Sequence, residues 1–191
     1  MGGEAEEGEY GMRNLLLTFL FAFLVCWGGT AAQANELKKL ADYESSDGGG
    51  KSWFELWAND SVFEVRTTLR EHRSGQIRKG KVAFDWTRWP DFRGAILDGE
   101  RRVVSARSGE LSASDFPMRV KTLTGEESIL SIVAFYVPQY TGGISLVIHP
   151  PEKEPSASED PGLRLEYLGD PDFINLLLAG ERAYGLYLAK Q

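Results

Sequence analysis

The chain alternates between apolar and polar residues over one long stretch, Val62 to His72, and this alternation limits the fold more than any other feature. A period of two puts successive side chains on opposite faces of an extended strand, so the stretch predicts a half-buried β-strand. One face carries mainly apolar side chains: Phe63, Val65, Thr67 and Leu69. The other face is mostly charged: Glu64, Arg66, Thr68, Arg70 and His72.

A second strand is predicted to return after a glycine turn. Ser74-Gly75-Gln76 has the small and polar residues of a hairpin turn, and the stretch that follows, Ile77 to Trp86, alternates again. We expect it to point three side chains inward and three outward: Val82, Phe84 and Trp86 inward, and Lys79, Lys81 and Asp85 outward. The two strands predict an antiparallel hairpin with one charged face.

Further strands are predicted along the rest of the chain. The segments are Ala95–Leu97 and Arg102–Ala106 around an Asp98-Gly99 turn, Met118–Leu123, Ser128–Val137, Ile144–Ile148, Leu163–Tyr167 and Tyr184–Ala189. The stretch from Ser128 to Val137 is apolar on both faces, which is typical of a central strand covered on both sides.

Two segments predict helices. Asn35 to Ser46 carries leucines at helical spacing, while Asp170 and Pro171 offer an N-cap and a first residue to an apolar helix that Gly180 would end. The sequence shows no internal repeat and no second domain. We therefore predict a mainly β fold, with α+β as the alternative: a single antiparallel sandwich or curved, barrel-like sheet of about eight strands with one C-terminal helix.

The start of the chain predicts an export signal. Arg13 supplies a positive charge, Leu15 to Trp27 is an apolar run too short to cross a bilayer, and Ala32-Gln33-Ala34 offers small residues to a signal peptidase. We expect cleavage after Ala34 and a protein that works in the periplasm or outside the cell. Because four glutamates precede Met12, where such signals are normally positive, we also expect translation to begin at Met12.

The predicted organisation has three parts: a signal peptide over 1–34, an N-terminal segment with a glycine-rich linker over 35–51, and a single β-rich domain over 52–191. Cleavage would remove Cys26, the only cysteine, and so leave no disulfide and no thiol chemistry. The full chain has 21 basic and 28 acidic residues, a net charge of −7, and loss of Arg13 and four glutamates would leave −4. This mild acidity argues against a general nucleic-acid binder. The sequence contains no second long apolar segment, so it predicts no membrane span.

Several common chemistries lack their motifs. The segment 48–52 imitates the end of a phosphate-binding loop, but Ser45 stands where that loop needs a glycine. The two histidines, His72 and His149, are far apart in the sequence, so we predict surface positions for both, no metal site and no cofactor. The chain has no Gly-x-Ser-x-Gly elbow. A pair of carboxylates from distant parts of the chain, as in glycosidases, stays open.

The charged face of the predicted hairpin is the first candidate site. Its basic side chains are Arg66, Arg70, His72, Lys79 and Lys81, with Arg73 and Arg78 beside the turn. Concentrated positive charge on an acidic chain predicts binding of an anion such as a polysaccharide or a lipid head group. The alternative is a solvated strand face whose charges discourage pairing between sheet edges.

A segment rich in arginine and aromatic residues, 86–93, is the second candidate site. Trp89, Phe92 and Arg93 lie next to a proline in a predicted loop, where such side chains often bind partners and where tryptophan suits sugar rings. The alternative is that both rings fold back onto the core. Trp53 and Trp57 allow the same two interpretations.

These features predict an exported envelope protein that binds a partner without catalysis, the partner being an envelope protein, an anionic glycan or a lipid. We expect no nucleic-acid partner. A first alternative is a periplasmic carrier, in which a curved sheet and the apolar helix around Phe173–Leu178 enclose a lipid or another apolar ligand. Gly80 to Gly99, with its tryptophans and its proline, is similar to periplasmic lipoprotein-carrier proteins, and this resemblance, which has no specific motif, implies the same function. A second alternative is a hydrolase with an acidic pair.

Overall fold

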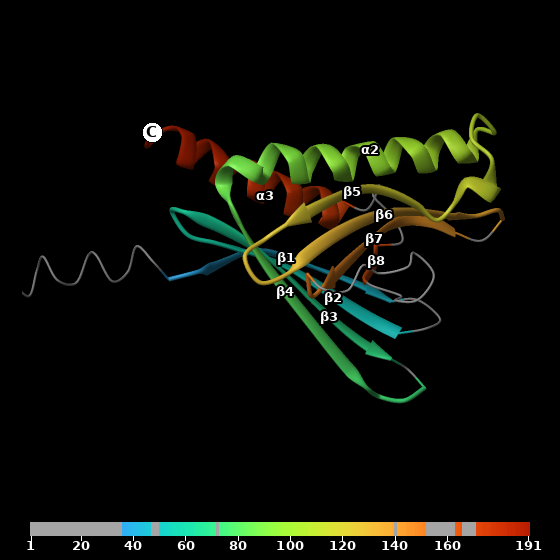
Figure 1. Cartoon of the computed structure of the whole chain (residues 1–191), viewed down its shortest axis with the longest axis horizontal. Helices are drawn as coiled ribbons and strands as arrows, with labels where there is room; N and C mark the ends of the chain where they lie inside the picture. The colour runs from blue at the N-terminus through green and yellow to red at the C-terminus, as the bar shows by residue number, and fades with distance from the viewer. Residues whose placement is uncertain (1–35, 47–49, 72, 140, 152–162, 166–170) are drawn as a thin grey trace, which may run out of the picture. The chain divides into compact units, whose positions relative to one another are not determined.

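The computed structural model describes residues 36–46, 50–71, 73–139, 141–151, 163–165 and 171–191 (Figure 1). The chain divides into residues 1–36 and a unit formed by 37–191, and the fold is that of the second unit. The predicted signal peptide, its cleavage after Ala34 and the predicted start at Met12 lie outside the described residues. None of the helices in the described ranges has the length and apolar character that crossing a membrane requires.

The fold is mainly β and antiparallel, as predicted, and its strands form two four-stranded sheets, not one curved sheet of eight. The first sheet has the order β1-β2-β3-β4 and the second the order β5-β6-β7-β8. The strands of the first sheet are β1 (Lys38–Ser46), β2 (Gly50–Ala58), β3 (Val62–Glu71) and β4 (Ile77–Asp85). Those of the second are β5 (Met118–Thr124), β6 (Ile129–Val137), β7 (Thr141–His149) and β8 (Leu163–Leu165).

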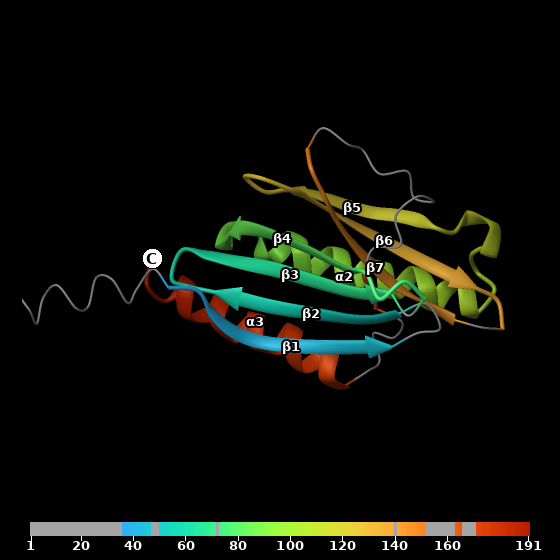
Figure 2. The same ribbon diagram turned by 90° about the horizontal axis from the view of Figure 1, so that it is seen from below.

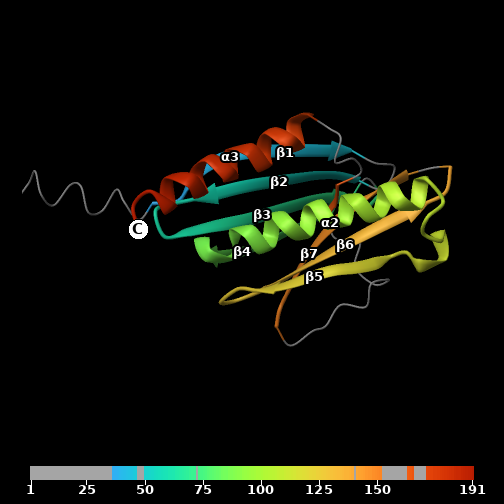
Figure 3. The same cartoon turned by 90° about the horizontal axis from the view of Figure 1, so that it is seen from above.

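Two long helices follow the two sheets along the chain, α2 (Trp89–Arg107) after β4 and α3 (Pro171–Leu188) after β8. Short 3-10 turns, η1 (Trp86–Arg88) and η2 (Ala113–Asp115), flank α2. The element order of four strands and a helix therefore occurs twice, although the sequence shows no repeat. Each helix packs mainly on the sheet of the other half: α2 on β5, β6 and β7, and α3 on β1 and β2 (Figures 1 and 3).

The predicted hairpin at residues 95–106 is wrong, because these residues belong to α2. Buried positions recur along α2 at the three- and four-residue spacing of a helix face: Trp89, Phe92, Ala95, Ile96, Gly99, Val103 and Ala106. Gly99 is not a turn residue. A Cβ atom at this position would lie 2.7 Å from Cδ1 of Ile144, so the glycine allows the helix to approach β7 closely.

Two other secondary-structure predictions are also wrong. The helix predicted over Asn35–Ser46 is the edge strand β1, where Tyr43 pairs with Phe54 of β2. The last predicted strand, Tyr184–Ala189, belongs mainly to α3, which continues past Gly180 to Leu188. In both cases an apolar pattern of a few residues fits a helix and a strand, and packing against a distant element decides between them.

The hairpin of β3 and β4 is confirmed. Gly75 has a φ of 66°, the left-handed conformation that a glycine tolerates in a turn. Val82 and Phe84 are buried on the inner face as predicted, and Lys79, Lys81 and Asp85 are exposed. The prediction of a central strand is also confirmed, since β6 is buried on both faces from Leu130 to Ala134.

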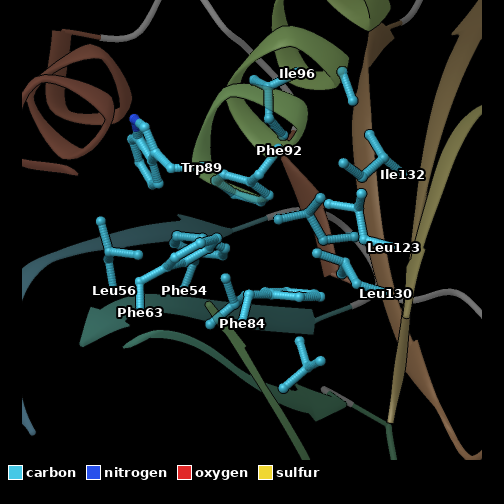
Figure 4. Packing of buried hydrophobic residues seen from close by; sticks show 14 of the residues in the cluster. Phe54, Leu56, Phe63, Phe84, Trp89, Phe92, Ile96, Leu123, Leu130 and Ile132 are labelled. Carbon is cyan, nitrogen blue, oxygen red and sulfur yellow. The ribbon is translucent and has the colours of Figure 1, made fainter. Parts of the chain in front are cut away.

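The core lies where the inner face of the first sheet meets α2 and the second sheet (Figure 4). Phe63 of β3 is at its centre, with the rings of Phe84, Trp86, Trp89 and Phe92 between 5.3 and 5.8 Å away, centroid to centroid. From α3, the buried Leu176 completes this cluster. The opposite face of the first sheet turns away from both helices (Figure 2).

Candidate functional site

The candidate site is the face of β1–β4 that points away from the helices, called here the outer face. Antiparallel register places its side chains opposite one another across the strands: Arg66 opposite Lys81, Thr68 opposite Lys79, and Lys51 opposite Arg70. Directly opposite side chains on one face of a sheet have Cβ atoms about 4.5–5.5 Å apart. The basic residues predicted from the alternation in β3 and β4 are therefore brought together on a single surface.

Three of these cations have no acidic partner among the described residues. Arg70, Lys79 and Lys81 are exposed, and none of them forms an ion pair with another residue in the described part of the chain. Arg73 and Arg78 are also exposed at the turn end of the hairpin, while His72 lies outside the described residues. The outer face thus has a cationic half on β3 and β4.

Other cations of the same face are neutralised by carboxylates. Lys39 pairs with Asp42 and Glu55, Lys51 pairs with Glu44, and Arg66 pairs with Glu64. A hydrogen bond from the Lys51 ammonium and a weaker one from the Trp53 indole hold the pKa of Glu44 below its ordinary value, against the opposing effect of desolvation. Glu44 is therefore ionised at any pH near neutral.

Two tryptophans stand among these charges on β2. Trp53 and Trp57 are half-buried on the outer face, and each indole N–H donates a hydrogen bond to a carboxylate: to Glu44 at 2.8 Å and to Glu55 at 3.0 Å. The guanidinium carbon of Arg66 lies 4.0 Å from the Trp57 ring centroid, and Nζ of Lys51 lies 5.3 Å from that of Trp53. Such cation–π contacts and hydrogen bonds limit the rotation of both rings.

The sequence left the position of these two tryptophans open. The signal that settles it is the alternation of Lys51, Trp53, Glu55 and Trp57 with buried residues along β2. In an extended strand this spacing puts all four side chains on one face.

The second candidate site is not a surface of exposed aromatic rings. Trp89 and Phe92 are both 0% exposed, because α3 and β3 pack against them. The Trp89 indole donates a hydrogen bond to Glu181 of α3 at 2.8 Å, and Arg93 forms an ion pair with the same glutamate at 3.2 Å. The alternative interpretation, that both rings fold onto the core, is correct.

His149 is likewise not on the surface, contrary to the prediction. It is 8% exposed, its Nε2 lies 3.2 Å from Oγ of Ser131, and its Nδ1 lies 3.1 Å from the carbonyl oxygen of Pro150. Ser131 is 1% exposed. The pair satisfies buried polar atoms between β6 and β7.

An open cleft of about 490 Å³ lies where the end of β4 meets the turn between β5 and β6. Its wall includes two carboxylates, Asp85 and Glu126, beside Arg88. Asp85 Oδ1 already accepts hydrogen bonds from the backbone N–H and the hydroxyl of Thr87, and Arg88 pairs with Asp91 at 3.3 Å. These contacts give both side chains a structural role: Asp85 caps the start of η1, and Arg88 pairs with a carboxylate in the first turn of α2. Within the described residues no group of three or more His, Cys, Asp or Glu side chains is placed to hold a metal ion.

Comparison of the sequence with models of protein families finds no match, and comparison with curated protein sequences finds no similar protein.

Proposed function

We propose that this protein binds an anionic ligand on the outer face of β1–β4, without catalysis, and that it does so outside the cytoplasm, as the leader predicts. The observation that carries the proposal is the group of three exposed cations, Arg70, Lys79 and Lys81, without acidic partners among the described residues. On a chain with a net charge of −7, acidic side chains to neutralise them are plentiful. Within the described residues no carboxylate forms an ion pair with any of the three, and this favours an external anion as the partner.

Protection of a sheet edge explains these cations only in part. Lysines on an edge strand discourage pairing with another chain, and Lys79 and Lys81 are on the edge strand β4. Arg70 is on β3, which is hydrogen-bonded on both sides, to β2 and to β4. It has no edge to protect, so anion binding explains the whole group better.

Charge reversal tests the proposal. We expect Arg70→Glu combined with Lys81→Glu to weaken binding to polyphosphate and to dextran sulfate by roughly tenfold or more, because an attractive contact becomes repulsive at both positions. Binding would be measured by titration calorimetry at low and at physiological ionic strength, with a weaker effect expected at high salt.

Arg101→Glu is the control. Arg101 is 76% exposed on α2, a helix that lies on the other side of the first sheet from the outer face (Figure 2). Its reversal changes the net charge by −2, which is half the change in the double variant, and does so away from the outer face. We expect binding to change by no more than about twofold in this variant. The proposal is wrong if neither polyanion binds the protein, or if Arg101→Glu weakens binding as much as the double variant does.

A further inference from the structure

We infer that the anionic ligand is an acidic polysaccharide whose sugar rings stack on Trp53 and Trp57 while its acid groups contact the cations of β3 and β4. This inference rests on the proposed function and adds the chemical class of the ligand. It follows from the way in which aromatic rings, carboxylates and cations are distributed across the strands of the outer face.

The two indoles are arranged as a platform before any ligand arrives. Each has its N–H held by a carboxylate, and a cation lies over one face of each ring: Lys51 of the same strand over Trp53, and Arg66 of the next strand over Trp57. A sugar ring therefore stacks on the other face of the indole or displaces the cation. A strand rises about 3.3 Å per residue, so ring positions four residues apart are separated by about 13 Å. One extended chain of rings lying along β2 can therefore contact both indoles.

The charges are divided between the two halves of the face. Carboxylates lie around the indoles: Asp42, Glu44 and Glu55 on β1 and β2, and Glu64 opposite Trp57 on β3. Arg70, Lys79 and Lys81, which have no ion-pair partner among the described residues, lie on β3 and β4. Carboxylate oxygens accept hydrogen bonds from hydroxyl groups and repel phosphates. A polymer with a hydroxyl-rich ring face and separate acid groups matches both halves.

A single-stranded nucleic acid matches this arrangement less well. It also combines rings with negative charge, and stacking on aromatic side chains is its usual mode of binding. Its bases, however, have no hydroxyl groups, whereas the rings of a polysaccharide carry hydroxyls that can donate hydrogen bonds to Glu44 and Glu55 beside the indoles. We therefore favour the polysaccharide, and nucleic acid becomes one outcome of the test.

The experiment compares polyanions with and without rings. The probes are polygalacturonate and dextran sulfate, which have sugar rings, and polyphosphate, which has none. We expect Trp53→Ala combined with Trp57→Ala to weaken binding to the two polysaccharides by about tenfold and to change polyphosphate binding by no more than about twofold. The variant Trp53→Phe with Trp57→Phe keeps a flat ring at each position, and we expect it to retain most of the affinity.

Intrinsic fluorescence gives a second measurement. Of the four tryptophans in the described residues, Trp86 and Trp89 are buried in the core, so a change on adding polysaccharide is expected from Trp53 and Trp57 and should be lost in the double alanine variant. Near-ultraviolet circular dichroism of the buried tryptophans checks that each variant is folded.

The outcomes separate this inference from the proposed function. In one outcome, polyphosphate and the polysaccharides bind and charge reversal lowers their affinity, but the double alanine variant binds the polysaccharides normally. This outcome overturns the inference and leaves the proposed function standing. The same holds if oligothymidylate binds more tightly than both polysaccharides and displaces them. If no polyanion binds, the proposed function fails as well.

Discussion

Gly180 shows at the scale of one residue how a sequence signal acquires a different meaning in the folded chain. It follows an apolar run and predicts the end of a helix, yet α3 continues for two further turns. A Cβ atom here would overlap the six-membered ring of Trp89. Trp89 is fully buried and hydrogen-bonded to Glu181, so the ring has no free space to move into.

Alanine at two glycines of α3 should therefore change stability in opposite directions. We expect Gly180→Ala to lower the free energy of unfolding by roughly 2 kcal/mol or more, since it overpacks the core. Gly185 has no heavy atom within 4 Å of its ideal Cβ position, and Gly185→Ala should raise stability by up to about 1 kcal/mol through helix propensity. Urea denaturation of both variants measures the difference, and equal effects would contradict this account of Gly180.

At the scale of elements, one ion pair connects the start of α2 to the second sheet. Nζ of Lys121 in β5 lies 2.6 Å from Oδ1 of Asp91 in α2, and Arg88 lies on the other side of the same carboxylate. Lys121 and, to a smaller extent, Arg88 hold the pKa of Asp91 below its ordinary value of 3.8, against desolvation. The folded state therefore favours the ionised carboxylate more than the unfolded state does.

The sign of the pH dependence follows from this direction. The contribution of Asp91 to stability is present above the unfolded pKa and is lost as the pH falls through the lower folded value. We expect Asp91→Asn to cost on the order of 0.5 kcal/mol at neutral pH, a small amount because both side chains are about 40% exposed. The cost should vanish in strong acid.

Urea unfolding of the wild type and of Asp91→Asn, from neutral pH down to strong acid, measures how the stability cost of the substitution changes with pH. Lys121→Met is the companion variant, and it should show a similar loss at neutral pH if the ion pair is its origin. A cost of Asp91→Asn that does not change with pH would contradict the ion-pair explanation.

At the scale of the whole described unit, the two halves of the chain depend on each other. Residues 37–111 contain β1–β4 and α2, but the helix that covers β1 and β2 comes from the other half. Trp86 illustrates the dependence, since its ring contacts Tyr184 and Tyr187 of α3. Neither half can bury the apolar face of its own sheet with its own helix alone.

Fragments of the chain test this dependence. We expect a fragment of residues 37–111 to lack the near-ultraviolet circular dichroism of its buried tryptophans, and a mixture with residues 112–191 to restore it. The intact chain should unfold in one cooperative transition. A native-like signal from the first fragment alone, or two separate transitions of the intact chain, would show that the halves fold independently.

Local pattern was sufficient to predict β3, β4 and β6 and the basic side chains of the outer face. Alternation and turn glycines act within a few residues, since backbone geometry sends neighbouring side chains to opposite faces of a strand. Arg66, Arg70, Lys79 and Lys81 therefore share a surface in any fold that contains this hairpin.

Tertiary packing decided the rest. Gly99 and Gly180 allow close approach to Ile144 and Trp89, partners that no local pattern identifies. The buried Trp89 indole donates its hydrogen bond to Glu181, a residue 92 positions away in the sequence. That Arg70 has no ion-pair partner in the described part of the chain likewise emerges only when the strands are paired. Whether a side chain is buried, neutralised or free depends on contacts between distant segments, and these form only when the whole unit folds.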